Sequence, residues 1–168
     1  MEAVSPSLDG LRIAVVTVSD RSAAGQRPDA TGPVLVAGFR AAGAEVIGSV
    51  VPDDAAEVTR AIEAAIASGA RAVVTTGGTG IGPRDVTPEA TRPLIARELP
   101  GIPELLRQRD ADQSPLVALS RGLSGVVAHE PPALVINLPG SLSAVTSALE
   151  VLPSVMAHAI AQLGGEDH

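Results

Sequence analysis

The sequence contains no cysteine, lysine, tryptophan or tyrosine, and its single aromatic residue is Phe39. Without cysteine the chain cannot use a thiolate as a nucleophile or a metal ligand. The net charge of −7 and the shortage of aromatic rings argue against nucleic acid as a partner. No apolar run approaches the roughly 20 residues of a membrane span, and the start, MEAVSPSLDG, lacks the basic end and apolar run of a signal peptide. We therefore expect a cytoplasmic protein with no membrane partner.

The length of 168 residues and the hydrophobic share of 45% predict a single domain over residues 1–168, with an ordered core at about 11–163. Short β-branched runs alternate with segments of helical periodicity, which predicts an α/β fold: a doubly wound, mostly parallel sheet with helices on both faces. Strands are expected at 11–18, 44–51, 71–76 and 133–138, and GVVAHE (125–130) is a candidate antiparallel edge strand. Helices are expected at 33–42, 55–68, near 88–97, near 103–109 and over 140–165, with a kink or restart at Pro153.

In such folds ligands bind beyond the carboxyl ends of the parallel strands. The glycine-rich segment that follows the third strand, GGTG at 77–80, is the most unusual of these regions. It is not a P-loop, which requires lysine, and it is not a dinucleotide fingerprint, because Pro83 stands where the last glycine would be. Glycines let backbone N–H groups approach an anion closely, although a tight strand-to-helix turn is the alternative.

Carboxylates follow two of the predicted strands. Asp85 comes just before a helix that Thr87 is expected to cap, and it either pairs with Arg84 or binds a metal. Asp53 and Asp54 follow the second strand, and only one of them is needed to cap the next helix. Two groups of carboxylates beside a loop that could bind phosphate suit Mg²⁺, which is usually bound by one or two carboxylates together with substrate phosphates.

Two further segments belong to the same predicted edge. Ser19 and Asp20 follow the first strand, and the turn NLPGS (137–141) follows the last, with Ser141 as the expected N-cap of the final helix. A strand, a Pro-Gly turn and a helix N-terminus form a general anion site, although a plain capped turn has the same pattern. No ligand role is expected for the histidines, which are His129, His158 and His168.

Five motifs resemble those of one family. TVSDRSAAGQRPDATGP, VVPDD, TTGGTGIGPRDVTPEA, LSRG and INLPGS occur in the order found in the Mog/MoaB family of molybdopterin adenylyltransferases, within residues 11–163. The resemblance implies the molybdopterin-binding fold, usually as a homotrimer. It also implies transfer of AMP from ATP to the phosphate of molybdopterin with Mg²⁺, ahead of metal insertion, with a molybdenum-insertion protein as a candidate partner.

The resemblance also implies which residues form the site. Asp53 and Asp85 match the critical carboxylates, and we expect them to act in catalysis and to hold the metal. The expected substrate-binding residues are Ser19, Asp20, Thr76, Gly77, Gly78, Thr79, Gly80, Ser120, Pro139, Gly140 and Ser141.

Three other functions stay open. The chain could be a molybdopterin carrier without adenylyltransferase activity, a nucleotide pyrophosphatase on the same fold, or an interaction protein with an ordinary α/β core. The two aspartates weigh against a carrier, because binding alone would not need both. A pyrophosphatase would work without molybdopterin, and an interaction protein would bind no nucleotide.

Overall fold

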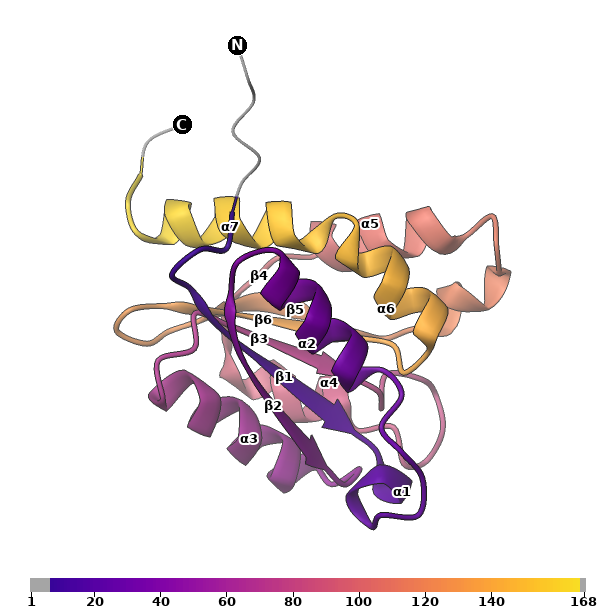
Figure 1. Cartoon of the computed structure of the whole chain (residues 1–168). Coiled ribbons are helices and arrows are strands. Elements are labelled where there is room, and N and C mark those ends of the chain that lie inside the picture. Colours follow the sequence, from indigo (N-terminus) through magenta and orange to yellow (C-terminus); the bar gives the residue numbers. More distant parts are fainter. Residues whose placement is uncertain (1–6, 167–168) are drawn as a thin grey trace.

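The structure is a computed structural model that describes residues 7–166; residues 1–6 and 167–168, including His168, lie outside this range. Six strands form one sheet (Figure 1). They are β1 (Arg12–Val18), β2 (Glu45–Val51), β3 (Ala72–Thr76), β4 (Ile95–Glu98), β5 (Ser124–Val127) and β6 (Ala133–Leu138). The helices are α1 (Asp20–Ala23), α2 (Gly32–Ala41), α3 (Ala55–Ala67), α4 (Thr87–Thr91), α5 (Gly101–Asp110), α6 (Leu142–Leu149) and α7 (Leu152–Leu163), with 3-10 turns η1 (Arg92–Leu94) and η2 (Pro115–Leu119).

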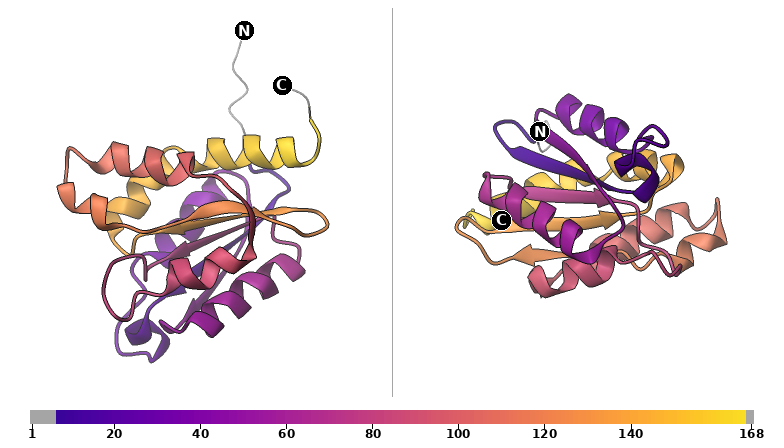
Figure 2. Two further views of the ribbon diagram at one scale, coloured as in Figure 1. Left: turned by 180° about the vertical axis from the view of Figure 1, so that it is seen from behind. Right: turned by 90° about the horizontal axis from the view of Figure 1, so that it is seen from below.

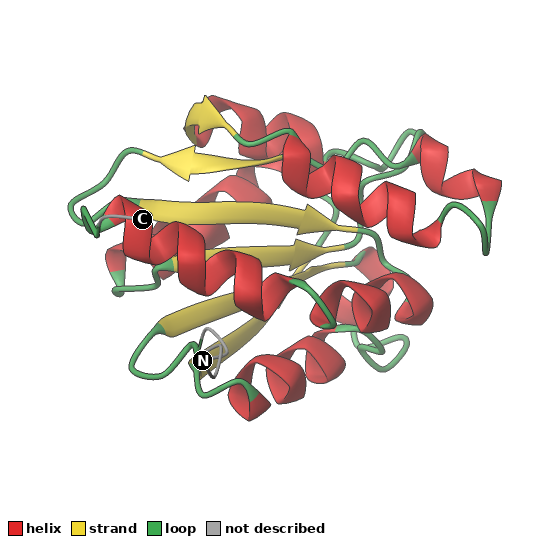
Figure 3. Cartoon of the chain, turned by 90° about the horizontal axis from the view of Figure 1, so that it is seen from above, coloured by secondary structure: helices red, strands yellow, loops and turns green. Residues whose placement is uncertain are grey.

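The sheet is mostly parallel, as the sequence predicts. The strand order is β2-β1-β3-β6-β5-β4; the first four strands run parallel, and β5 and β4 are antiparallel to their neighbours. The carboxyl ends of the four parallel strands therefore meet at one edge of the sheet (Figure 3). This edge is where the predicted site segments begin.

The β-branched runs bury both faces of the sheet. Along β1 and β3, Val15 and Val74 pack into one hydrophobic cluster, whereas Val16 and Val73 pack into the other. Helices α2, α5, α6 and α7 cover the first face, and α3 and α4 cover the second (Figure 2). Continuous apolar strands are typical of a sheet covered on both sides, which is the predicted fold class.

The prediction near 88–97 is wrong in its second half. Helix α4 ends at Thr91, η1 contains Pro93, and the outermost strand β4 begins at Ile95. Proline cannot donate the backbone hydrogen bond that would continue the helix, and Ile95 pairs with Val127 instead. The candidate strand over 125–130 exists as the antiparallel strand β5. It is not the edge strand, because β4 pairs with it on its outer side.

The final helical stretch divides into α6 and α7, and Pro153 lies in the first turn of α7. This is the restart that proline predicts. Within residues 7–166 no single helix is long and apolar enough to cross a membrane, and α6 and α7, which meet those criteria only together, are bent by 56°. Their apolar residues, among them Val145 and Met156, pack into the core.

Candidate functional site

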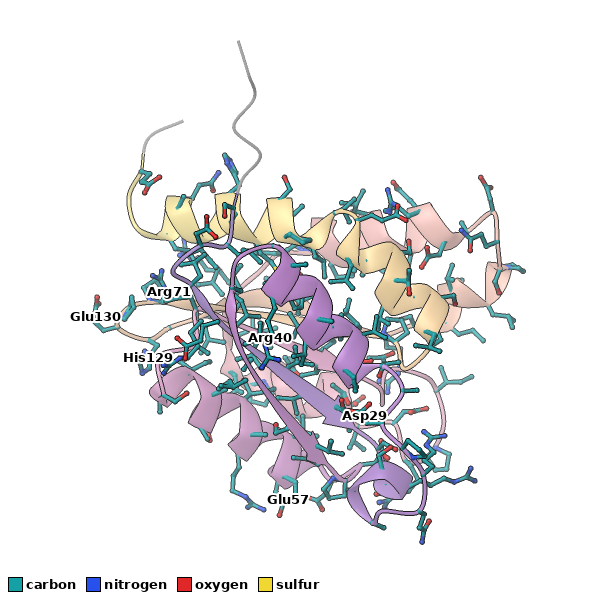
Figure 4. All side chains as sticks on the ribbon, in the orientation of Figure 1. Asp29, Arg40, Glu57, Arg71, His129 and Glu130 are labelled. Atoms are coloured by element: carbon teal, nitrogen blue, oxygen red, sulfur yellow. The ribbon has the colours of Figure 1, made fainter. Side chains whose placement is uncertain are left out.

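A cavity of about 830 Å³ opens at the carboxyl edge of the parallel strands. All the site residues expected from the sequence line it, with Asp20 as the exception: Ser19, Asp53, Thr76, Gly77, Gly78, Thr79, Gly80, Asp85, Ser120, Pro139, Gly140 and Ser141. Asp29, which contacts Thr17 at the end of β1, also lines it, whereas His129 and Glu130 lie at the opposite end of the sheet (Figure 4). The fold thus brings together segments that are far apart in the sequence.

The glycine loop is packed so closely that side chains do not fit. Gly77 and Gly78 have φ values of +99° and +68°, a region that other residues rarely adopt. A Cβ atom on Gly77 would lie 2.4 Å from the carbonyl oxygen of Val18. The N–H of Gly77 donates to the carbonyl of Leu138 at 3.0 Å. The loop after β3 is therefore fixed against the ends of β1 and β6.

Asp53 and Asp85 are both held by backbone amides. Asp53 Oδ2 accepts from the N–H of Asp20 at 2.8 Å, and the N–H of Asp53 donates to Asp20 Oδ1 at 2.9 Å. Asp85 Oδ2 accepts from the N–H of Gly82 at 2.8 Å. Across residues 7–166 the Oδ1 atom of neither Asp53 nor Asp85 takes part in a hydrogen bond, so each carboxylate has one fixed oxygen and one available for a ligand.

Both carboxylates face the glycine loop. A Cβ atom on Gly78 would lie 3.3 Å from Asp53 Oδ1, and one on Gly80 would lie 2.8 Å from Asp85 Oδ2. The absence of side chains at these glycines therefore leaves the space beside the carboxylates open. A ligand on this loop would meet both aspartates.

Arg84 contacts Asp20 rather than Asp85. Its Nε donates to Asp20 Oδ2 at 3.0 Å, and its Nη2 donates to Asp20 Oδ1 at 3.1 Å. The pairing of Arg84 with Asp85 considered from the sequence is therefore absent from the described residues. Asp20 lies outside the cavity lining, but it connects Arg84 to the backbone of Asp53.

The predicted N-cap of α4 is also wrong. Val86 occupies the cap position, and Thr87 is the first helical residue. The Thr87 hydroxyl instead donates to the carbonyl of Gly77 at 2.9 Å. This side chain is fully buried, and its hydroxyl holds the glycine loop instead of capping α4.

The other predicted helix caps are present. Asp54 caps α3 by accepting from the N–H of Glu57 at 3.0 Å, which leaves Asp53 free for another role. Ser141 caps α6 by accepting from the N–H of Ala144 at 3.3 Å. Ser19 caps α1, a short helix directly after β1 that is not among the helices expected from the sequence.

Arg121 is a site residue that the sequence did not single out. Its N–H and Nε each donate at 2.8 Å, to the carbonyls of Thr79 and Gly80 respectively, and its Nη2 donates to the carbonyl of Asp85 at 2.9 Å. The guanidinium also pairs with Glu89 and lowers the pKa of that carboxyl, while Glu89 raises the pKa of Arg121. Arg121 thus holds the second half of the glycine loop, at Thr79 and Gly80, together with the backbone of Asp85.

The sequence also missed one wall of the cavity. Pro103, Leu106, Arg107 and Asp110 lie on one face of α5, and residues of η2 continue the same wall. Their spacing of three or four residues places them on one side of a helix. The spacing alone does not predict that this side of the helix faces the cavity.

Residues 14–158 match the family model described as "Probable molybdopterin binding domain". The chain belongs to this family. A member from Pyrococcus furiosus named "Molybdopterin adenylyltransferase" is 40% identical, and the alignment covers 88% of each protein. A Synechococcus elongatus relative named "Molybdenum cofactor biosynthesis bifunctional protein" is 41% identical over 96% of this chain but only 50% of its own length.

Solved structures of the family share the fold. The structure described as "tungsten cofactor synthesizing protein MoaB from Pyrococcus furiosus" superposes with a TM-score of 0.86 at 37% identity, covering 91% of this chain and 96% of that one. A molybdopterin biosynthesis protein from Mycobacterium abscessus gives a TM-score of 0.84 at 40% identity, covering 92% and 96%.

Proposed function

We propose that this protein is a molybdopterin adenylyltransferase of molybdenum cofactor biosynthesis. The observation that carries the proposal is that Asp53 and Asp85 flank one glycine loop, each with an unengaged carboxylate oxygen. Relatives at 35–40% identity that carry the name "Molybdopterin adenylyltransferase" support it. The chain spans half the length of the Synechococcus relative, so the activity proposed here is that of the domain described.

The reaction transfers the adenylyl group in one displacement. An oxygen of the terminal phosphate of molybdopterin attacks the α-phosphorus of ATP, the bond from that phosphorus to the bridging oxygen breaks, and pyrophosphate leaves. Such a reaction depends mostly on positioning and on neutralising charge. The backbone N–H groups of Gly77–Gly80 and the N-terminus of α6 at Ser141 are suited to hold phosphate oxygens.

The donor set fits Mg²⁺ bound together with a nucleotide. Residues 7–166 contain no group of three or more His, Cys, Asp or Glu side chains that could bind a metal ion by themselves. Asp53 and Asp85 offer two carboxylates, and Mg²⁺ is usually held by one or two carboxylates plus substrate phosphates. Asp53 and Asp85 would therefore hold the ion against the nucleotide. When bound, Mg²⁺ would offset the negative charge on the phosphates.

Any basic contact to a phosphate must come from arginine, because the chain has no lysine. Arg27 and Arg107 both line the cavity, and Arg27 Nη2 lies 3.4 Å from the hydroxyl of Ser19. We include in the proposal a homotrimeric state and an interaction with a molybdenum-insertion protein. The cytoplasmic location expected from the sequence stays a prediction.

The test is pyrophosphate release from ATP and Mg²⁺, measured with and without molybdopterin. The proposal predicts release only when molybdopterin is present, with one adenylyl-molybdopterin formed per pyrophosphate. Binding of molybdopterin without release would identify a carrier. Cleavage of a dinucleotide without molybdopterin would identify a pyrophosphatase, and either result would overturn the proposal.

A further inference from the structure

Arg84 and Asp20 form an ion pair between two loops of the site. Arg84 lies in the loop after β3, and Asp20 follows β1, 64 residues earlier in the chain. Two nitrogens of the guanidinium, Nε and Nη2, donate to the two carboxylate oxygens at 3.0 and 3.1 Å. Such a forked pair adds geometric specificity to the attraction between the charges. The pair therefore holds one loop in a defined position against the other.

The ion pair also connects the two carboxylates of the site. Asp85 is the next residue after Arg84 in the chain. Asp20 and Asp53 exchange two hydrogen bonds, at 2.8 and 2.9 Å, in which the side chain of each accepts from the backbone N–H of the other. The contacts thus run from Asp53 through Asp20 and Arg84 to the backbone beside Asp85.

The reciprocal hydrogen bonds orient the carboxylate of Asp53. Its Oδ2 atom is held by the N–H of Asp20. Its Oδ1 atom lies toward the glycine loop, where a Cβ atom on Gly78 would come within 3.3 Å of it. The carboxylate of Asp20 holds the backbone of Asp53 in turn, and Arg84 holds that carboxylate. Arg84 thus reaches Asp53 through Asp20.

The exposure of the ion pair argues against a role in folding alone. The side chains of Arg84 and Asp20 are 68% and 42% exposed. Exposed ion pairs contribute little to folding stability, because water and salt screen the charges. Asp20 also lies outside the cavity lining, and both of its carboxylate oxygens already accept hydrogen bonds. Its position suits a role in holding the carboxylate of Asp53 in place.

The position of Asp53 matters if it shares one Mg²⁺ with Asp85. Mg²⁺ requires nearly octahedral geometry, with oxygen ligands at about 2.0–2.1 Å. Two carboxylates from different loops meet this requirement only if the separation of the loops is fixed. Residues that hydrogen-bond to a metal-binding side chain orient it, and their loss typically weakens metal affinity or activity about 10–100-fold.

We propose that Arg84 is a positioning residue for adenylyl transfer: through Asp20 it orients the carboxylate of Asp53 and fixes the separation of Asp53 from Asp85. The proposal rests on the proposed function for the role of the two carboxylates. It gives Asp20 the same positioning role, in place of a contact with the substrate.

The binding test uses Arg84→Gln, which removes the charge and the forked contact. The probe is α,β-methylene-ATP, which cannot transfer AMP, measured by calorimetry with Mn²⁺ and again with EDTA in place of the metal. The variant should bind the Mn²⁺–nucleotide about 10–100-fold more weakly than wild type, while its affinity for the metal-free nucleotide stays within twofold. The kcat should fall by a similar factor and the KM for molybdopterin should stay within twofold. Equal losses with and without the metal would show that Arg84 binds the phosphates directly, and would overturn the proposal.

The matched control is Arg60→Gln. Arg60 pairs with Glu57 on α3, its side chain is 63% exposed, and it lies outside the site cavity. This variant should keep the metal affinity and kcat of wild type. The melting temperatures of both arginine variants should stay within about 2 °C of wild type. A large fall in Arg84→Gln alone would show a structural role and overturn the proposal.

A double-mutant cycle tests whether Arg84 acts through Asp20. Asp20→Asn keeps a side-chain oxygen that can accept from the N–H of Asp53, but it loses the charge that holds Arg84. If the two residues act in series, the double variant should bind the Mn²⁺–nucleotide about as weakly as the weaker-binding single variant. Losses that multiply in the double variant would mean that the two residues act separately, and would overturn the proposal.

Amide hydrogen exchange tests the arrangement without any ligand. In Arg84→Gln the N–H groups of Asp20 and Asp53 should exchange about tenfold faster than in wild type, because the carboxylate of Asp20 is no longer held. Arg60→Gln should leave both rates unchanged. This result would support the positioning role even if wild type released no pyrophosphate, which would overturn the proposed function alone. Unchanged exchange at both groups in Arg84→Gln would overturn the positioning role even in an active enzyme.

Discussion

Asn137 joins four segments around the site, and replacing it should test how the cavity is held together. The side chain is 3% exposed. Its Nδ2 donates to the hydroxyls of Thr75 and Thr91, each at 3.0 Å, and its Oδ1 accepts from the N–H of Leu123 at 3.1 Å. These bonds tie β6 to β3, to α4 and to the segment before β5.

Asn137→Ala removes all three hydrogen bonds and leaves the N–H of Leu123 without its side-chain acceptor. At about 1 kcal/mol for each bond, the free energy of unfolding should fall by about 3 kcal/mol. For a chain of this size the melting temperature should fall by about 6–12 °C. Urea unfolding and thermal melts measure both quantities.

The matched control is Gln108→Ala, on the exposed side of α5, which should change stability by less than about 0.5 kcal/mol. Because the segment held by Asn137 leads into Arg121, Asn137→Ala should also weaken nucleotide binding. A loss of stability below about 1 kcal/mol would refute the reasoning, since the three bonds together would then contribute less than one ordinary hydrogen bond.

Two further predictions concern the glycine loop and its anchor. Gly77→Ala should destabilise the protein by about 2 kcal/mol or more, because Gly77 has a φ of +99° and the added Cβ would lie 2.4 Å from a carbonyl oxygen. Gly101→Ala, in open space at the start of α5, should instead stabilise it by about 0.4–1 kcal/mol in the same melts. Glu89→Gln should destabilise the protein above the ordinary pKa of Glu, because Arg121 lowers the pKa of Glu89 in the folded state, and the difference from wild type should vanish as the pH falls through that lowered pKa. A difference that grows toward acid would contradict the assigned direction of the pKa shift.

The parts of the fold that could be predicted from the sequence are those set by local patterns. The β-branched runs of β1, β3 and β6 and the periodic helices α2 and α3 are continuous signals, and each matches its predicted range to within about two residues. Strand β4 has four residues, follows a proline, and is defined by its pairing with β5, which is a contact between distant segments. No local pattern could have located it.

The candidate site divides in the same way. The glycine loop, the carboxylates and the cap at Ser141 were predicted because strand ends of a parallel sheet converge. The partner of Arg84, the buried hydroxyl of Thr87 and the anchoring by Arg121 depend on how loops pack against each other. The cavity wall formed by α5 and η2 depends on which side of α5 faces the cavity. Helical periodicity shows that the residues share one side of the helix, but it does not show what that side faces.

The measurement that tests the central claim most directly is a double-mutant cycle on Asp53 and Asp85. Molybdopterin-dependent pyrophosphate release would be measured for wild type, Asp53→Asn, Asp85→Asn and the double variant over a range of Mg²⁺ concentrations. Asp54→Asn is the control, because asparagine also caps helices well and should keep near-normal turnover. If both carboxylates hold one ion, each single variant should lose about a hundredfold or more in kcat/KM. The kcat/KM of the double variant should then be only slightly lower than that of the less active single variant. Near-normal turnover in either variant, or fully additive losses in the double variant, would contradict a shared metal site.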